Sequence, residues 1–337
     1  MAVDALSDVL RAVRLAGAVY FDVAATAPWV AEQPTRDMVL SKILPGAQHL
    51  ISYHVVTEGS CFAGLIGAEP ILVRAGEVVV FTKGDPHVMS SRPGMRAAPV
   101  TAEAFDAAAA SSLPFSVNYG GGGPPSVRLV CGFLACHAQS ANLLLENLPA
   151  VIKAGNPQDG DANWLGEFIR VAISESRNRR AGGESVLAKL SELMFIEVVR
   201  RHLEALAPAE SGWLAGLRDP FVGKALSLIH RSPARNWTIE ELAREVGLSR
   251  SVLAARFADL VGLPPMHYLA KCRMQIASEL LSGGSTNIAT VAAETGYGSE
   301  ASFSRAFKKM VGVPPSAWRR GLGHDEPRPV VRVAPLE

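Results

Sequence analysis

Hydrophobic and polar residues follow two different rhythms along this chain. Between residues 40 and 90, short runs rich in valine, isoleucine and phenylalanine are separated by glycine, proline and aspartate. That pattern is typical of strands joined by tight turns. From Asp219 onward, apolar residues recur every three or four positions, which predicts amphipathic helices. We therefore expect an α+β protein with a small β-barrel or sandwich first and an all-helical part last.

Between these parts the pattern predicts a loop, a further strand and two helices. Residues 92–126 are rich in alanine, glycine and proline and indicate a mobile insertion loop without a core of its own. The run VRLVCGFLACHA predicts a strand, and NWLGEFIRVAISESRN predicts a helix. A long amphipathic helix is predicted over 184–206, whose apolar face either packs on the barrel or pairs with its copy in another subunit. The residues on that face are Leu187, Leu190, Met194 and Val198.

A Val-Gly-x-Pro-Pro motif occurs twice, at Gly262 and again fifty residues later. In the first copy, Thr238 and Glu241 have the spacing of a capping box that starts a helix. Gly247 can adopt a positive φ at a turn, and Ser249 can cap the helix that follows. A short helix, a turn with glycine and a second helix make a helix-turn-helix unit. The second helix is expected to turn Val252, Leu253, Phe257 and Leu260 inward.

The second copy repeats this order, with Gly296 at the turn and Phe303, Phe307 and Met310 facing inward. Between the copies, PMHYLAKCRMQIASELLSGG predicts one helix that its final glycines end. In each copy, glycine closes the second helix and the two prolines prevent its continuation. Two such units joined by a rigid helix can place recognition helices in successive major grooves, roughly 34 Å apart.

Charge is unevenly distributed along the chain. The net charge is +1, yet residues 219–320 contain 13 Lys and Arg against 8 Asp and Glu, a net of +5. Local positive charge fits a polyanionic partner such as DNA. No apolar run approaches the ~20 residues that cross a bilayer, and the N-terminus lacks the basic-then-apolar order of a signal peptide. Four cysteines without CxxC or framework spacing fit a reduced cytoplasm.

The segment from roughly Asp219 to Gly321 resembles the AraC/XylS family of bacterial transcriptional regulators. Its most specific part is NIATVAAETGYGSEASFSRAFKKMVGVPPSAWRR, which is similar to the C-terminal signature of that family. The resemblance implies a cytoplasmic DNA-binding regulator, usually an activator, that binds double-stranded promoter DNA and contacts RNA polymerase. We expect a homodimer, formed through the barrel or through the 184–206 helix.

The resemblance also assigns DNA contacts to single residues. Arg305 is expected to contact a base or a nearby phosphate, whereas Ala254 and Ala255 offer only apolar contact, for example to a thymine methyl. Lysines and arginines farther along are expected to contact phosphates, which position a protein without specifying a sequence. The first recognition helix contributes Arg250, Ser251, Ala254, Ala255 and Arg256. The second contributes Glu300, Ala301, Ser302, Ser304 and Arg305, followed by Lys308, Lys309, Arg319 and Arg320.

The strand region contains a motif that resembles the second motif of the cupin barrel. Gly76, Gly84 and His87 stand at the expected positions, Thr82 replaces the usual proline, and the first motif is reduced to His54. The segment is similar to the cupin-type sensor domain of one subgroup of these regulators, some of which sense oxidants through cysteines. The resemblance therefore implies a domain that responds to a small molecule, a metal or an oxidant.

A metal site in this barrel would use His54 and His87, with Glu58 or Cys61, because imidazole and thiolate suit a divalent metal such as zinc, iron or nickel. The incomplete first motif removes one of the usual ligands. The alternative is a pair of buried histidines that holds no metal.

A thiol switch would oxidise Cys131 together with Cys61 or Cys136. Cys131 and Cys136 are five residues apart, so on one strand they face opposite sides, which disfavours a direct bond between them. The alternative is a structural role for all the cysteines, including Cys272 on the helix between the repeats, because free cysteine is commonly buried.

These observations favour a sequence-specific transcriptional regulator that is not an enzyme. One alternative is a metal-dependent cupin enzyme fused to a DNA-binding tail, which would require a full ligand set. Another is a DNA-repair methyl acceptor, which would require an activated cysteine with metal-type spacing that this sequence lacks. The expected boundaries are 1–206 for the cupin-like sensor and dimerisation domain, 207–218 for a linker, 219–321 for the double helix-turn-helix domain and 322–337 for a disordered tail.

Overall fold

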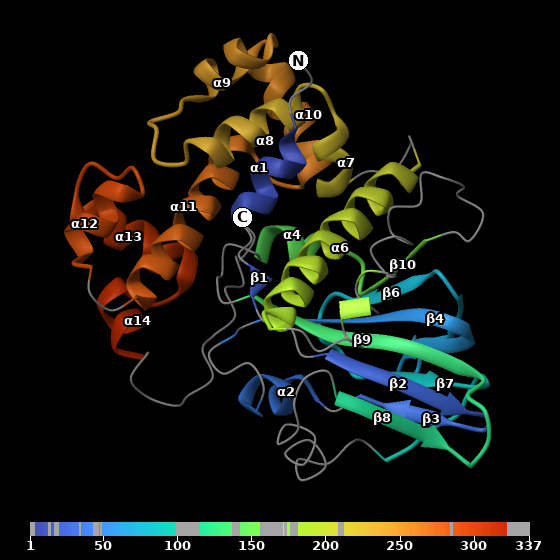
Figure 1. Ribbon diagram of the computed structural model, residues 1–337. Helices are drawn as coiled ribbons and strands as arrows, with labels where there is room; N and C mark the ends of the chain where they lie inside the picture. Colours follow the sequence, from blue (N-terminus) through green and yellow to red (C-terminus); the bar gives the residue numbers. More distant parts are fainter. Residues whose placement is uncertain are drawn as a thin grey trace. The chain divides into compact units, whose positions relative to one another are not determined.

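The described residues fall into two compact units (Figure 1). One contains Leu15–His137 and Leu148–Ala205; the other contains Met1–Arg14, Ala138–Asn147 and Leu206–Glu337. The described residues 4–12 and 142–147, which the sequence analysis assigned to the first domain, group with the C-terminal helices. The computed structural model describes residues 4–12, 15–16, 20–33, 35–42, 47, 49–98, 115–136, 142–155, 171, 174–175, 181–207, 212–283 and 286–321 of the chain.

The described strands form one curled sheet, which we call the barrel, with the main path β10-β6-β4-β9-β2-β8. Strand β4 pairs with β6 and β9 along its first part and with β5 and β7 along its last part, so it runs from one wall to the other. This sheet confirms the predicted β-barrel (Figure 1). The strands are β1 (Leu15–Ala16), β2 (Tyr20–Thr26), β3 (Val30–Glu32), β4 (His49–Leu65), β5 (Ile71–Arg74), β6 (Val78–Phe81), β7 (His87–Ser90), β8 (Phe115–Gly120), β9 (Val127–Cys136) and β10 (Val151–Ala154).

Strand β8 corrects the prediction of a loop over 92–126. It pairs in parallel with β2, with Phe115 opposite Phe21 and their ring centres 5.4 Å apart. Phe115 is buried and the next residues alternate with exposed positions, which is the period of a strand with one face covered. The flanking alanines and glycines hid this short alternation in the sequence.

Helix α6 (Gly183–Ala205) confirms the long helix predicted over 184–206. Leu187, Met194 and Val198 are buried, and the Tyr53 hydroxyl on β4 lies 2.7 Å from the Ser191 Oγ. Three of the four residues on the predicted apolar face therefore pack within the chain, and the fourth, Leu190, is half-buried. Of NWLGEFIRVAISESRN, only residues 171, 174 and 175 are described, and all three are helical. A short helix, α2 (Arg36–Lys42), also belongs to this unit.

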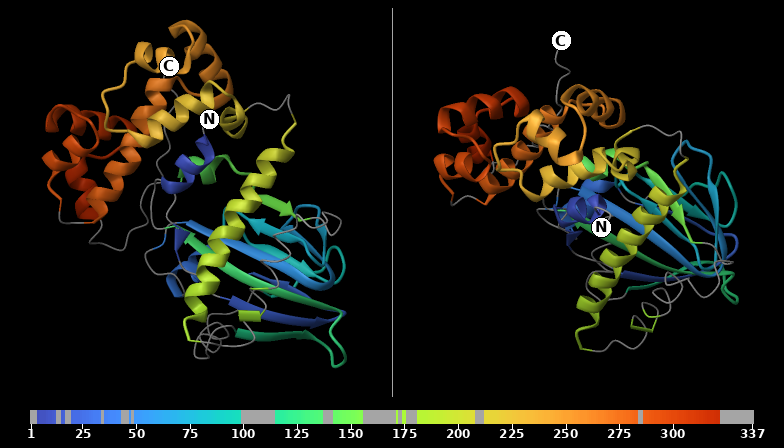
Figure 2. Two further views of the ribbon diagram at one scale, coloured as in Figure 1. Left: turned by 45° about the horizontal axis from the view of Figure 1, so that its top comes forward. Right: turned by 90° about the horizontal axis from the view of Figure 1, so that it is seen from above.

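The other unit is helical and contains both predicted helix-turn-helix pairs, α9 with α10 and α12 with α13. The linker helix α11 runs between them, as predicted (Figure 2). In the core of the second pair, Phe303 packs against Phe307, and Phe307 packs against Trp318 of the helix that follows. The helices are α1 (Ala5–Ala12), α4 (Asn142–Asn147), α7 (Trp213–Arg218), α8 (Val222–Arg231), α9 (Ile239–Val246), α10 (Arg250–Val261), α11 (Pro265–Ser282), α12 (Ile288–Glu294), α13 (Glu300–Val311) and α14 (Pro315–Gly321).

The local signals at the helix ends are confirmed. Thr238 and Glu241 form both hydrogen bonds of the capping box, and Gly247 has a φ of 81° at the turn. Each Pro-Pro has a second role that the sequence analysis missed, because Pro265 begins α11 and Pro315 begins α14. Proline suits a first helical position, where its missing N–H is not needed. Among the described helices, none has the length and apolar character needed to span a membrane.

Candidate nucleic-acid interface

Helix α10 is held by one buried face and presents the other. Leu253 and Phe257 are fully buried, and the Ser249 Oγ accepts a hydrogen bond from the Val252 amide at the helix start. Ser251 and Ala255 are exposed and Ala254 is half-buried. Val252, predicted to point inward, is 49% exposed, because Leu253 and Phe257 already fill the core and Val252 is rotated about 100° from Leu253.

Two arginines predicted to contact DNA from α10 make ion pairs within the chain. Arg250 lies 2.9 Å from Glu240, and both side chains are more than half exposed. Arg256 donates from Nε to Asp219 at 2.8 Å, and its guanidinium lies 5.4 Å from the Phe221 ring centre. The Arg250 pair is open to solvent, whereas Arg256 attaches α10 to the start of α8.

Asp219 is the anchor of that second ion pair. Its Oδ1 also accepts hydrogen bonds from the amides of Phe221 and Val222 at the start of α8. Burial acts to raise the pKa of Asp219, but the bonds from Arg256 and from these amides outweigh it and hold that pKa below its ordinary value. Asp219 therefore remains charged at neutral pH as the partner of Arg256.

Helix α13 presents cations that have no carboxylate partner among the described residues. Ser299 caps its start, and Phe303 and Phe307 bury its inner face. Within the described part of the chain, the exposed cations of α13 make no ion pair; they are Arg305, Lys308 and Lys309. Of the other predicted contacts, Glu300 and Ala301 are exposed and Ser302 and Ser304 are half-buried. Beyond the helix, Arg320 is exposed, and Arg319 donates to the Thr286 carbonyl at 3.4 Å.

The barrel interior brings His54 and His87 together. Their Nε2 atoms are 2.6 Å apart, and the His87 ring stacks on Phe81 with ring centres 3.6 Å apart. The His87 Nδ1 lies 3.0 Å from the Asp85 carbonyl oxygen, so this nitrogen must carry a proton. In neutral His87 the Nε2 then accepts from the His54 Nε2–H, which leaves the His54 Nδ1 as an acceptor.

That acceptor is buried and has no hydrogen-bond partner in the described structure. Burial lowers the pKa of His54 well below its ordinary value, with a smaller contribution from His87. Burial also lowers the pKa of His87 to about 4. Both rings are therefore neutral near pH 7, and the pair forms one hydrogen-bonded chain that ends at the Asp85 carbonyl.

The predicted metal ligands do not converge as a set, because Glu58 lies apart from the two histidines. A bulge in β4 between Val56 and Glu58 adds one residue to that strand, which turns Glu58 to the outer face. There it is 62% exposed and pairs with Arg128 at 3.4 Å. Among the described residues, no three His, Cys, Asp or Glu side chains form a group that could hold a metal. The residues present therefore do not fit a resident metal ion.

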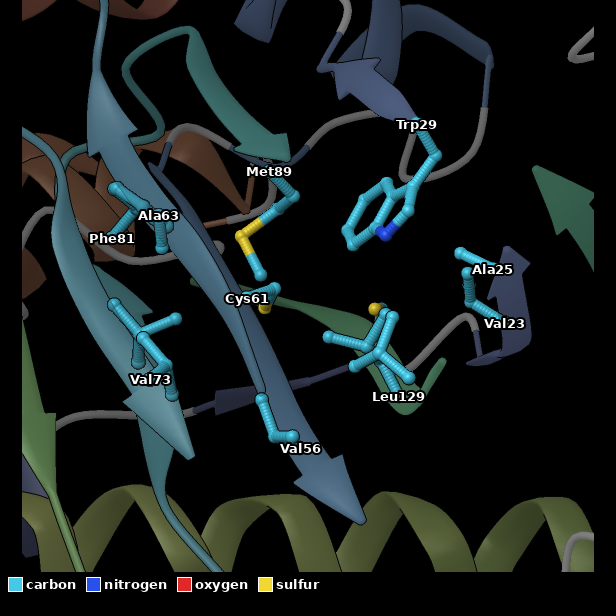
Figure 3. Packing of buried hydrophobic residues seen from close by; sticks show 13 residues of the cluster. Val23, Ala25, Trp29, Val56, Cys61, Ala63, Val73, Phe81, Met89 and Leu129 are labelled. Atoms are coloured by element: carbon cyan, nitrogen blue, oxygen red, sulfur yellow. The ribbon is translucent and has the colours of Figure 1, made fainter. Parts of the chain in front are cut away.

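The cysteines inside the barrel are in an apolar environment (Figure 3). Cys61 lies among Met89, Val73 and Trp29 in the core cluster, and Cys131 belongs to the same cluster. Burial raises the pKa of Cys61 to about 12 and raises that of Cys131 further. Because the thiolate is the reactive form, this environment disfavours oxidation of either thiol. The side chain of Cys136 lies outside the described residues, and Cys272 is buried in α11.

Known families match both halves of the chain. Residues 4–204 match the Cupin family and residues 242–321 match the Helix-turn-helix domain family. A protein of Streptomyces lividans described as an AraC-like transcription regulator is 34% identical over 276 residues, covering 81% of this chain and 88% of its own. A Streptomyces antibioticus protein of the same description is 36% identical over 279 residues, with the same coverage. The chain belongs to the AraC-like transcription regulators.

This regulator is therefore a DNA-binding transcription factor with a cupin-like N-terminal domain. A more distant relative, the RCS-specific HTH-type transcriptional activator RclR of Escherichia coli, is 27% identical over 275 residues, covering 81% of this chain and 86% of its own. Among solved structures, the C-terminal domain of AraT from Geobacillus stearothermophilus is 33% identical, covers 30% of this chain and 85% of its own, and has a TM-score of 0.30. The relatives that share the length of the chain are named as regulators, not as enzymes.

Proposed function

We propose that this regulator binds promoter DNA in the cytoplasm with α10 and α13 in the major groove and activates transcription by contacting RNA polymerase. The observation that carries the proposal is the pair of capped helices whose inner faces are buried and whose outer faces are open. Leu253 and Phe257 anchor α10, and Phe303 and Phe307 anchor α13. A rigidly mounted helix with an open face is what groove reading requires. The activator role is supported by the name of the relative RclR.

The two helices read DNA differently in this proposal. The open face of α10 carries Ser251, Val252 and Ala255, which suit thymine methyl groups and single hydrogen bonds rather than guanine. On α13, Arg305 can form the bidentate contact that selects guanine, while Lys308 and Lys309 neutralise phosphates. Because Arg256 is held by Asp219, we assign it a structural role and give base reading by an arginine to Arg305.

The test compares Arg305→Ala with Lys308→Ala on a site selected from random DNA by the full chain. Arg305→Ala should weaken binding to the selected site about 10- to 100-fold and weaken non-specific binding much less, because a base contact is lost. Lys308→Ala should weaken binding to all sequences and reduce the slope of log affinity against log salt by about one, because one phosphate contact is lost.

Arg92→Ala is the matched control, since it removes one exposed arginine from the barrel unit. It should leave unchanged both the ratio of specific to non-specific affinity and the slope of log affinity against log salt. An Arg305→Ala protein with an unaltered ratio of specific to non-specific affinity would remove Arg305 from base reading.

The regulator acts as a homodimer in this proposal, with α6 as the contact. Val186 and Leu193 are 43% and 51% exposed, and with the half-buried Leu190 they form an apolar stripe at helical spacing. The same stripe on a second copy of the chain would cover these apolar side chains in a two-fold contact.

The barrel receives the signal in this proposal. A resident metal does not fit the described residues, and burial raises the pKa of the barrel thiols Cys61 and Cys131, which disfavours a redox signal. Buried polar atoms normally have hydrogen-bond partners, yet the His54 Nδ1 and the Trp29 Nε1 have none in the described structure. One is an acceptor and the other a donor, so we assign the barrel an uncharged, polar small molecule as its signal. Site selection repeated with added metals, oxidants and small polar compounds tests this assignment.

A further inference from the structure

The linker helix α11 contains a buried arginine. Arg273 is only 9% exposed, although arginine is almost never buried without a partner. Its partners are backbone carbonyls: Nε donates to the Pro233 oxygen and Nη2 to the Arg235 oxygen, both at 2.8 Å. Burial lowers the pKa of Arg273 and the nearby Tyr297 opposes that shift. Among the described residues, no carboxylate forms an ion pair with this guanidinium, and its hydrogen bonds to the two carbonyls fix its position.

The two carbonyls belong to the loop between α8 and α9, which leads into the first helix-turn-helix unit. Trp237 fixes this loop: it is 3% exposed, and its Nε1 donates to the Ser232 carbonyl at 3.0 Å. The guanidinium of Arg235 lies 3.8 Å from the Trp237 ring centre. Arg273 thus holds an ordered segment that leads into the first helix-turn-helix unit.

The other side of Arg273 contacts the second helix-turn-helix unit. Its guanidinium lies 5.5 Å from the ring centre of Tyr297, which follows Gly296 in the turn between α12 and α13. A Cβ on Gly296 would lie 2.3 Å from the Ala234 carbonyl oxygen and 2.8 Å from the Arg273 Nη2. A side chain at Gly296 would collide with both atoms. The α12–α13 turn of the second helix-turn-helix unit is therefore in direct contact with the α8–α9 loop that leads into the first helix-turn-helix unit.

We infer that Arg273 is a positioning residue that fixes α10 relative to α13, and thereby the spacing between the two DNA segments that they read. The inference rests on the proposed reading of DNA by both helices. A single helix joins the two units (Figure 2), and the loops at its two ends would leave each unit free to swing. A contact among α11, the α8–α9 loop and the α12–α13 turn removes that freedom.

The experiment measures the affinity of the full chain for its selected site and for the same site with one base pair inserted between the two contacted segments. The wild type should bind the longer site at least about tenfold more weakly, because one helix loses its base contacts. Arg273→Met keeps the length of the side chain but removes its donors. It should lower affinity for the original site about tenfold and change affinity for the longer site less than twofold, so that spacing discrimination is lost.

Two further variants keep the test decisive. Gly296→Ala retains Arg273 but forces the junction apart, and it should lose spacing discrimination even where Arg273→Met fails to fold. Gln275→Met is the matched control, because Gln275 is equally buried in α11 and its Nε2 has no partner among the described groups. That variant should prefer the original site to the longer site by the same factor as the wild type.

The outcomes separate the inference from the proposed function. A wild type that binds both sites equally would overturn the reading of DNA by two helices, and the role of Arg273 with it. Suppose instead that the wild type prefers the original site to the longer site, and that the Arg273→Met and Gly296→Ala proteins show the same preference. That result would overturn only the role of Arg273. Equal weakening of both sites in Arg273→Met would assign that residue to stability alone.

Discussion

Three histidines contribute to the response of the protein to acid: His87, which is buried, and His54 and His230, which are half-buried. Burial lowers the pKa of His87 and of His230 to about 4, and lowers that of His54 as well. In an unfolded chain these rings titrate near 6.5. Between these pH values the unfolded chain binds more protons than the folded one, so stability rises with pH. The stabilising effect of keeping these rings neutral is complete above about pH 6.5 and is lost as the pH falls toward 4.

We expect the free energy of unfolding to fall between pH 6.5 and 4, by up to about 3 kcal/mol for a histidine shifted this far. His87→Asn should flatten that dependence for the barrel unit, because the amide can still donate to the Asp85 carbonyl but does not titrate. Urea unfolding at a series of pH values measures the effect, with His267→Asn on α11, a half-buried histidine, as the control. Identical pH slopes in wild type and His87→Asn would contradict this account.

At the scale of elements, helix ends carry the local stability of the DNA-binding unit. The Thr238 amide donates to the Glu241 carboxylate at 3.1 Å, and the Glu241 amide donates to the Thr238 Oγ1 at 3.1 Å. Both groups would otherwise be left without a partner at the start of α9. The same arrangement recurs in simpler form at α12, where the Thr290 amide donates to the Asn287 side chain at 2.7 Å.

Thr238→Ala should destabilise the helical unit by about 1 kcal/mol, because it removes the capping oxygen and weakens the reciprocal bond from Glu241. Thr290→Ala is the control: Thr290 is exposed and uses only its backbone amide, so the side chain can be removed without loss of the cap. Urea unfolding at pH 7 compares the two. Equal stabilities of the two variants would show that the capping box contributes little here.

At the scale of the whole molecule, we predict that dimerisation depends on the exposed stripe of α6. Leu193→Lys should convert a dimer to a monomer, because a charge would lie at the centre of the apolar contact. Sedimentation equilibrium at micromolar concentration measures the mass. Ile66→Lys is the control, since Ile66 is 41% exposed but lies in the barrel, away from α6 in the sequence. A wild type that sediments as a monomer would refute the dimer, and a dimeric Leu193→Lys protein would place its interface elsewhere.

The sequence alone determined the features that depend on a few neighbouring residues. The capping box at Thr238, the turn at Gly247 and the linker helix all follow from local conformational preference and hydrogen bonding within one turn of chain. The duplication was visible because the same local signals occur twice. The helical unit, with its DNA-binding role, was therefore predictable, as was a barrel with His54 and His87 in it.

Only the tertiary structure decided which side chains remain free. The sequence predicts that Arg256 and Arg305 both lie on open helix faces. In the structure, Asp219, 37 residues away along the chain, pairs with Arg256, whereas Arg305 has no partner among the described residues. Likewise, a bulge in β4 turns Glu58 outward, and the α8–α9 loop covers Arg273. Each outcome depends on groups that are distant in sequence and meet only after folding. Because burial and pairing are properties of such contacts, no local pattern encodes them.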